Sequence, residues 1–406
     1  MTVLTGVNLV LADRVLGPAT LVVDGERIVE MAAGTRFPET PGRLDLHGHF
    51  VLPGFVDVHV HGVEGVDSLD GGPALATIAR RLPRYGVTAF CPTTVASRPL
   101  ALREMLAAVS EARRSPDPLS ARVLPAHLES NFISREYRGA QPLECLRVPP
   151  RVTTPAVGPA AAADDDTYSG SDILAEIAAA RREVGIVTLA PELEGALELI
   201  EHLVSAGHRV SLGHSGADYE QGLAGVAAGA CHATHLFNRM PPFHHRNPGL
   251  VGAVLDSEAV AAEIICDGYH VHTSLVRAAV ARKAPSKVMA ITDGTAGSGL
   301  AVGSRASLGG RPVTVGEAAA FLADGTLAGS TLTMDRALRF LIEVAGYPLV
   351  DAAAMCSTVP ATELGLAGQG RLAAGGLADL AILDDRLRLV ATWIGGRQVF
   401  DARASS

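Results

Sequence analysis

The sequence predicts an α/β protein, a (β/α)8 barrel with a small β-sandwich domain built from both chain ends. Eight apolar segments alternate with helical stretches between residue 53 and about residue 360, which is the pattern of repeated β-α units. The first of these segments, residues 54–60, is too apolar for a one-sided surface strand, so we expect it to be buried on both faces. Both chain ends instead contain short strands of alternating polarity, separated by turn residues.

Eight is the number of parallel strands that closes a TIM barrel, a fold that takes about 250 residues. The stretch between the first two strands, residues 74–82, has the Ala, Leu and Arg content of a helix. We predict a barrel domain over residues 53–361 and a small β-domain from residues 1–52 and 362–406, with strands at 378–384 and 390–399. The predicted barrel strands are residues 54–60, 87–92, 122–129, 185–191, 209–214, 230–236, 261–267 and 287–293.

Two segments do not follow the repeated pattern. Residues 148–171 are rich in Pro, Ala and Asp and are expected to form a loop after the third strand. This loop is either a solvated insertion or a lid, because loops that follow barrel strands lie over the active site. Residues 297–330 are rich in Gly and are expected to form hairpins after the eighth strand.

Composition and charge exclude several classes of protein. Hydrophobic residues make up 48% of the chain and charged residues 19%, which predicts a well-packed globular core. The net charge of −9, without a basic cluster, argues against a nucleic-acid partner but permits a small anionic substrate. The first residues lack the features of a signal peptide, and no apolar stretch reaches membrane-spanning length, so we expect a cytoplasmic protein without a membrane partner.

Neither cysteine nor lysine is used in a way that suggests a site. The five cysteines have no CxxC spacing, so we expect buried small side chains and neither disulfides nor a thiolate zinc site. The only lysines are Lys283 and Lys287. Lys287 lies at the beginning of a strand, whereas barrel active sites lie at the carboxyl ends of the strands, so it is not expected to bridge two metal ions. Any ligand that bridges two metal ions must therefore be an ordinary carboxylate.

The pair His59 and His61 ends the apolar run of residues 53–62. In a β-strand, residues two apart lie on the same face about 6–7 Å from one another, so both imidazoles can converge on one metal ion. Two other His-x-His pairs are weaker candidates. His47 and His49 precede a turn in the predicted small sheet, whereas His270 and His272 precede a helix predicted to begin at Thr273, which leaves His270 as a single active-site candidate.

The carboxyl ends of the predicted strands supply one set of polar side chains. A buried histidine taken alone is more often a hydrogen-bonded core residue than a ligand, but four histidines with one glutamate match the ligand set of zinc or ferrous iron. Asp293, at the end of the eighth strand, can then act as general base and general acid beside the metal. The strand-end residues are His59, His61, Glu129, His214, His235, His270 and Asp293.

Ten short stretches, in a fixed order and spacing, give the chain a family resemblance. They are residues 53–62, 127–129, 188–192, 213–215, 234–240, 247–256, 267–271, 292–294, 329–334 and 375–380. On these motifs the chain resembles, over nearly its full length, the N-acetylglucosamine-6-phosphate deacetylase family of the amidohydrolase superfamily.

The resemblance implies a metal-dependent deacetylase, with one or two divalent ions of zinc or iron. It implies that Glu129, His214 and His235 hold the ion shared by all members. His59 and His61 would hold a second ion with Glu129 as the bridge, and members without this pair use one ion. Asp293 would take a proton from the hydrolytic water and pass it to the leaving amine.

The resemblance also implies the substrate contacts and a homodimer. Arg246 and His270 would contact the phosphate, with the arginine reaching into the neighbouring subunit. The sugar and acyl contacts would come from Asn238 with the backbone at Arg239, the loop at Ala140 and Gln141, and the backbone at Leu327, Ala328 and Gly329.

Several residues depart from the family pattern. Ser130 and Asn131 stand where members usually have GlyPro after HisLeuGlu, and Gln141 stands where members often have histidine. Arg239 replaces a small residue and adds a cation near the sugar. These changes leave N-acetylgalactosamine 6-phosphate, or another N-acyl amino sugar, as alternative substrates.

Two further alternatives remain open. A cyclic-amide or peptide amidohydrolase would use the same barrel, although the presence of Arg246 and His270 favours a phosphorylated substrate. A non-catalytic barrel should lack ligands, and none is missing here. Outside the candidate site, we expect His127 and His232 to be core histidines and Glu192 to cap a loop.

Overall fold

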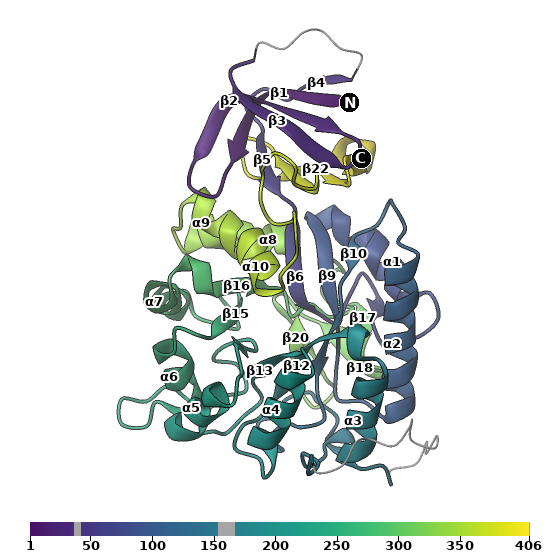
Figure 1. The fold of residues 1–406 in the computed structure, drawn as a ribbon, viewed down its shortest axis with the longest axis vertical. Coiled ribbons are helices and arrows are strands. Elements are labelled where there is room, and N and C mark those ends of the chain that lie inside the picture. Colours follow the sequence, from purple (N-terminus) through teal and green to yellow (C-terminus); the bar gives the residue numbers. More distant parts are fainter. Residues whose placement is uncertain (36–41, 153–166, 406) are drawn as a thin grey trace.

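The computed structural model describes residues 1–35, 42–152 and 167–405. Figure 1 shows a barrel with helices packed around it and a smaller β-sheet at one end, where both chain termini lie. The predicted fold class, a (β/α)8 barrel with a small β-domain from both chain ends, is confirmed. Among the described residues, no helix has the length and apolar character needed to cross a membrane.

The eight predicted barrel strands all form, and neighbouring strands pair in parallel. A parallel bridge between Val60 and Gly294 closes the barrel, and the His61 backbone N–H donates to the Gly294 carbonyl at 2.8 Å. The strands are β6 (Phe55–Val60), β9 (Val87–Thr94), β10 (Arg122–Val123), β11 (Ala126–Glu129), β12 (Val184–Leu189), β13 (Arg209–Leu212), β14 (His232–Ala233), β15 (Ala261–Ile265) and β16 (Val288–Ile291). The third predicted strand forms as two short strands, β10 and β11. The second of these, β11, pairs with β9 on one side and with β12 on the other.

Amphipathic helices cover the outside of the barrel. In α2 (Pro99–Arg114), Leu102, Leu106 and Val109 are buried at three- and four-residue spacing. α5 (Tyr219–Ala227) is preceded by Asp218, whose carboxylate accepts the Gln221 backbone N–H at 2.8 Å and so caps the helix. The others are α1 (Ala74–Arg81), α3 (Gly170–Ala179), α4 (Ala196–Ser205), α6 (Gly249–Asp256), α7 (Thr273–Lys283), α8 (Met334–Arg339), α9 (Leu349–Ala353) and α10 (Val359–Glu363).

The two chain ends meet in one sheet. Val51 of β5 (Phe50–Pro53) pairs with Ile382 of β21 (Leu380–Leu383), and β5 also pairs with β1 (Thr2–Val10). Leu4, Val51 and Trp393 are buried in the same apolar core, so both ends contribute to it. The exact domain boundaries remain a prediction. The remaining strands of this sheet are β2 (Val15–Asp24), β3 (Arg27–Ala33), β4 (Arg43–Asp45), β22 (Leu389–Ile394) and β23 (Arg397–Asp401).

The structure tests the prediction for one of the two irregular segments and leaves most of the other undescribed. The hairpins predicted within residues 297–330 are confirmed as an antiparallel sheet of β17 (Arg305–Leu308), β18 (Arg311–Val315), β19 (Ala319–Phe321) and β20 (Leu327–Ser330). A short hairpin of β7 (Gly62–Val63) and β8 (Val66–Asp67) follows the first barrel strand. Most of the 148–171 segment, residues 153–166, lies outside the described residues, so the lid and the solvated insertion both remain predictions.

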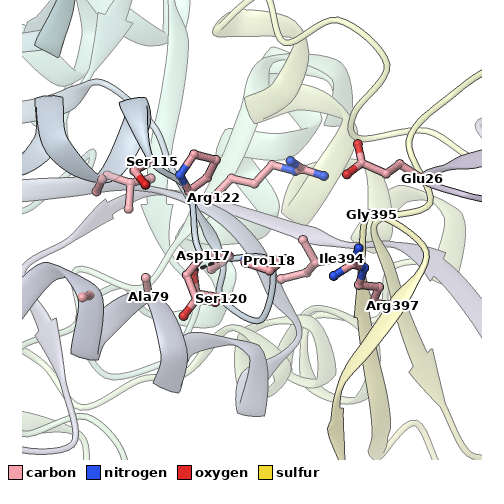
Figure 2. Close-up of a pocket in the computed structure, with 15 residues that line it drawn as sticks. Glu26, Ala79, Ser115, Asp117, Pro118, Ser120, Arg122, Ile394, Gly395 and Arg397 are labelled. Atoms are coloured by element: carbon pink, nitrogen blue, oxygen red, sulfur yellow. Dashed lines mark hydrogen bonds between the residues drawn. The ribbon is translucent and has the colours of Figure 1, made fainter.

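A cavity of about 200 Å³ lies where the small sheet meets the barrel. Figure 2 shows Glu26 and Gly395, from the small sheet, on the same side of this cavity as the end of the Arg122 side chain. The Arg122 guanidinium makes two hydrogen bonds to the Asp379 carboxylate, at 2.9 and 3.1 Å. This ion pair joins the barrel strand β10 to the chain just before β21.

Candidate metal and substrate site

Side chains from five barrel strands meet at the carboxyl end of the barrel. This is the end at which barrel enzymes carry their active sites. All six of these side chains are largely buried, and each belongs to a residue with no more than 8% of its surface exposed. They are His59 and His61 at the end of β6, Glu129 at the end of β11, His214 after β13, His235 after β14 and Asp293 after β16.

Three of these residues have an unusual backbone conformation. His214, His235 and Asp293 each lie two residues beyond the end of a strand, with φ values of 48°, 29° and 48°. Left-handed backbone costs a residue other than glycine about 1–3 kcal/mol, and such residues cluster at functional sites. The recurrence of this conformation at equivalent strand ends indicates that it serves the site.

Glu129 lies between two pairs of histidines. Its Oε1 atom is 3.0 Å from His214 Nε2 and 2.9 Å from His235 Nε2, and these two nitrogens are 3.0 Å apart. On the other side, Glu129 Oε1 is 3.5 Å from His59 Nε2, and Glu129 Oε2 is 3.5 Å from His61 Nε2. The carboxylate is therefore placed where it could bridge two ions.

Asp293 completes the group around the first histidine pair. The Nε2 atoms of His59 and His61 are 3.3 Å apart. Asp293 Oδ1 lies 3.4 Å from the first of these nitrogens and 3.3 Å from the second. A carboxylate oxygen and two ring nitrogens thus face the same small volume.

The geometry of these atoms fits a divalent metal ion. Tetrahedral bonds of about 2.0–2.1 Å place neighbouring ligand atoms about 3.3 Å apart, which matches the spacing found here. Three groups of potential ligands lie close together: His59, His61 and Glu129; Glu129, His214 and His235; and His59, His127 and Glu263. The two groups that contain Glu129 are the candidate metal positions. Buried carboxylates and imidazoles so close together need a cation or a shared proton to be stable.

The electrostatics of the site also favour a cation. Burial alone would lower the pKa of His59, but the carboxylates of Glu129, Glu263 and Asp293 outweigh it and raise that pKa to about 10. Burial would raise the pKa of Glu129, but the neighbouring histidines, chiefly His214, hold it well below its usual value. The pKa of Asp293 is likewise lowered, against the effect of burial, by His61 and His59. The field that favours a proton on His59 would equally favour a bound metal cation.

Three residues around the cluster position the candidate ligands. His59 Nδ1 lies 3.0 Å from the Oε2 atom of Glu263, and His214 Nδ1 lies 2.9 Å from the backbone carbonyl of Tyr137. Gln141 donates from its side-chain amide to Glu129, and its carbonyl accepts the backbone N–H of Ala96 at 2.7 Å. Sequence reasoning missed Glu263 and Tyr137. Glu263 could have been noticed as a lone carboxylate inside an apolar strand.

A pocket of about 440 Å³ opens above this cluster. Seven of the nine residues predicted to contact substrate line it, together with Glu136, Tyr137 and Leu308. The guanidinium of Arg239 donates to the Leu327 backbone carbonyl at 3.2 Å, which fixes a cation at the pocket wall. The seven predicted residues are Ala140, Gln141, Asn238, Arg239, His270, Leu327 and Gly329.

Of the two residues predicted to contact the phosphate, His270 lines the pocket and Arg246 lies outside it. The side chain of His270 is buried, and its Nδ1 lies 2.6 Å from Asp267 Oδ2. Its Nε2 is buried without a hydrogen-bond partner among the described residues, and the residue lines the pocket. Arg246 is exposed beside His245 and does not line the pocket of this chain. Ala328 is fully buried and does not line the pocket either.

Three residues that we expect to play structural roles make the following contacts. His127 Nδ1 lies 2.9 Å from the Val58 carbonyl and therefore carries a proton, which prevents this nitrogen from binding a metal. His232 is fully buried, and its Nε2 atom lies 3.6 Å from Glu363 Oε2. Glu192 accepts the Ser215 hydroxyl at 2.7 Å and the Gly216 N–H at 2.6 Å, as expected of a loop cap.

The chain is similar to a group of known enzymes over most of its length. The model of the amidohydrolase family matches residues 50–399. The N-acetylglucosamine-6-phosphate deacetylase of Rattus norvegicus is 37% identical, covering 96% of this chain and 90% of that protein, and that of Lysinibacillus sphaericus is 34% identical, covering 87% of each. A crystal structure of a Mycobacterium smegmatis deacetylase mutant in complex with N-acetyl-D-glucosamine-6-phosphate superposes with a TM-score of 0.86 at 31% identity, covering 98% of this chain and 99% of that one.

Proposed function

Because the chain belongs to the amidohydrolase family, and within it to the N-acetylglucosamine-6-phosphate deacetylases, we propose that it hydrolyses the N-acetyl amide of N-acetylglucosamine 6-phosphate. The products would be the amino sugar phosphate and acetate. The observation that carries the proposal is the placement of Glu129 between two histidine pairs, with Asp293 beside them at the base of a pocket. An amide is resonance-stabilised, so its hydrolysis requires an activated water, a polarised carbonyl and a protonated leaving nitrogen.

The first part of the proposal concerns the metal. Glu129, His214 and His235 would hold one divalent ion, and His59 and His61 would hold a second one with Glu129. Nitrogen and oxygen ligands of this kind suit zinc or iron. When bound, such ions lower the pKa of water and polarise the substrate carbonyl.

The second part assigns the proton transfers to Asp293. Its lowered pKa keeps the carboxylate ionised at neutral pH, so it can accept a proton from the attacking water. The same oxygen then returns the proton to the leaving nitrogen of the amide. His61, 3.3 Å away, together with the backbone around Asp293, holds the carboxylate at this position.

The third part concerns the substrate. His270, which lines the pocket and whose Nε2 has no partner among the described residues, would bond to the phosphate. Arg246 would reach the phosphate in the neighbouring subunit of a homodimer. The exposure of Arg246, outside the pocket of its own chain, supports this assignment. Asn238, Arg239, Ala140, Gln141 and the backbone of residues 327–329 would contact the sugar and the acyl group. We also propose a cytoplasmic location, because a charged sugar phosphate does not cross a membrane unaided.

Acetate release across a panel of substrates tests the proposal. The panel contains the 6-phosphates of N-acetylglucosamine and N-acetylgalactosamine, the two sugars without phosphate, and a cyclic amide. We expect the highest kcat/KM for N-acetylglucosamine 6-phosphate. Equal turnover with and without phosphate would refute the phosphate assignment, and turnover of the cyclic amide alone would refute the deacetylase.

One alternative substrate has specific support. Arg239 and Gln141 line the pocket, and both depart from the pattern that the family resemblance implies, so they are the residues by which the preferred sugar could differ. A higher kcat/KM for N-acetylgalactosamine 6-phosphate than for N-acetylglucosamine 6-phosphate would show that the galactosamine derivative is the preferred substrate. The proposed reaction, deacetylation, would stay the same.

A further inference from the structure

Glu263 is a fully buried acid in the middle of the barrel strand β15, whose other residues are all apolar. An ionised carboxylate in such surroundings is costly unless it is hydrogen-bonded or paired with a cation. No step of the proposed reaction uses Glu263 directly. Its position therefore needs another explanation.

The contact of Glu263 with His59 provides one. Glu263 Oε2 lies 3.0 Å from His59 Nδ1, and both side chains are completely buried. An ionised carboxylate only accepts hydrogen bonds, so Nδ1 of His59 carries the proton. The lone pair of His59 Nε2 then points toward His61 and Asp293, where a metal ion would bind.

Among the described residues, no other histidine side chain hydrogen-bonds to Glu263. His127 Nδ1 is 3.8 Å from Glu263 Oε1, but it donates to the Val58 carbonyl at 2.9 Å. Within the described part of the chain, Oε1 of Glu263 has no hydrogen-bond partner. Glu263 Oε2 also accepts the backbone N–H of His235 at 3.4 Å. The shorter bond, and the only one to a histidine side chain among the described residues, is the bond to His59 at 3.0 Å.

The histidines of the other metal position lack such a partner. His214 Nδ1 faces the backbone carbonyl of Tyr137, which is neutral. His235 Nδ1 has no hydrogen-bond partner among the residues that the structure describes. A carboxylate behind a histidine increases the basicity of the coordinating nitrogen more than a neutral acceptor does, so the charge of Glu263 favours one position over the other.

We propose that Glu263 is a positioning residue that acts through His59 and selectively stabilises the divalent ion held by His59 and His61. This inference rests on the proposed function insofar as it assumes a centre with two ions. It adds that occupancy of the two positions is controlled separately, because only one of them has a buried carboxylate behind its histidine. Loss of Glu263 should therefore weaken one position and spare the other.

Metal binding by the Glu263→Gln variant tests this. The metal-free full-length protein is titrated with Co2+, and the ions bound per chain are followed by elemental analysis and by the visible absorption of the bound cobalt. We expect two ions in the wild type. In Glu263→Gln we expect one position to bind about 10–100-fold more weakly, with the other unchanged. Unchanged binding at both positions, or equal weakening of both, would overturn the inference, as would a wild type that binds a single ion.

Two controls show whether Glu263 acts through His59. Glu176 is a buried glutamate that pairs with Arg103 outside the barrel, so Glu176→Gln should still bind two ions. The His59→Asn variant has already lost the metal position formed by His59 and His61. Adding Glu263→Gln to this variant should therefore weaken cobalt binding no further. A further weakening of the remaining ion in the double variant would contradict the proposed route.

Two more measurements complete the test. Glu263→Asp keeps the charge but shortens the side chain, so it should weaken the same position, and it replaces Glu263→Gln if that variant does not fold. Acetate release is measured separately. If the protein releases acetate but Glu263→Gln binds both ions as the wild type does, this inference alone is refuted. If Glu263→Gln loses one ion selectively but the wild type releases no acetate, only the proposed function is refuted.

Discussion

His61 Nε2 lies 3.3 Å from Asp293 Oδ1, across the junction between the first and last strands of the barrel. The two side chains are held there by the backbone, because the His61 N–H donates to the Gly294 carbonyl at 2.8 Å and the Asp293 N–H donates to the His59 carbonyl at 2.9 Å. Barrel closure thus sets the distance between a proposed metal ligand and the proposed proton acceptor. A site fixed in this way needs no loop movement to bring these two groups together.

Asp293→Asn should lower kcat sharply while leaving the metal in place. Asparagine has nearly the same shape but cannot accept the proton of the attacking water, and general acid–base catalysis contributes about 10²- to 10⁴-fold. We therefore expect kcat to fall by about this factor, with a smaller change in KM. Steady-state acetate release, together with metal content by elemental analysis, measures both. A variant that retains its metal and wild-type kcat would exclude Asp293 as the base.

His270→Ala should weaken recognition of the phosphate. His270 lines the pocket and its Nε2 atom has no partner among the described residues, so we expect a phosphate oxygen to bond to it. A hydrogen bond to a charged group contributes about 1.5–3 kcal/mol, which corresponds to about a 10- to 150-fold rise in KM. The same substitution should barely change turnover of the unphosphorylated sugar. An equal loss for both substrates would indicate a role in holding the pocket together.

The barrel and its polar strand ends could be predicted because both follow from local patterns. Apolar strands alternate with helices, and residues such as Glu129 and His214 come at or just after the ends of strands, which parallel pairing brings to one edge. Glu263 could not be assigned a role in this way. Its partner His59 is far away in the sequence and becomes a neighbour only when the barrel closes.

Gln141 and Arg246 show two other limits of the sequence. Gln141 was predicted from the family pattern to contact substrate, and it lines the pocket, but its side chain also bonds to Glu129. A loop residue that reaches back to a candidate ligand cannot be recognised without the path of the loop. Arg246 does not line the pocket of its own chain, so its predicted role depends on a second subunit and stays a prediction.

Asp379→Asn should destabilise the protein without affecting catalysis. The Asp379 carboxylate is buried, accepts two hydrogen bonds from Arg122 and also accepts the Gly395 N–H at 2.7 Å. Because Arg122 is partly exposed, we expect a loss of about 2 kcal/mol in the free energy of unfolding, between the values for exposed and buried pairs. Urea unfolding measures this, and kcat/KM should be unchanged. Asp256→Asn, in the exposed pair with Arg282, is the matched control and should cost less than about 1 kcal/mol.

Glu363 should make part of the stability depend on pH. Its carboxylate lies 2.9 Å from Lys287 Nζ and 3.6 Å from His232 Nε2. Burial would raise the pKa of Glu363, but His232 and Lys287 outweigh this effect and lower it to about 2. In the unfolded chain a glutamate has a pKa of about 4.3, so the unfolded chain takes up the proton first as the pH falls. The contribution of Glu363 is therefore complete above about pH 4.3 and is lost progressively as the pH falls toward about 2.

Glu363→Gln separates this effect from the general action of acid. The variant cannot titrate at this position, so the wild type should be the more stable protein near neutral pH, and the difference should shrink in acid. From the direction and size of the pKa shift, we expect the difference in the free energy of unfolding to narrow by about 1 kcal/mol between about pH 5 and about pH 3.5. Urea unfolding of both proteins across this range measures the difference. A difference that stays constant or widens in acid would mean that the ion pairs of Glu363 do not stabilise the folded chain.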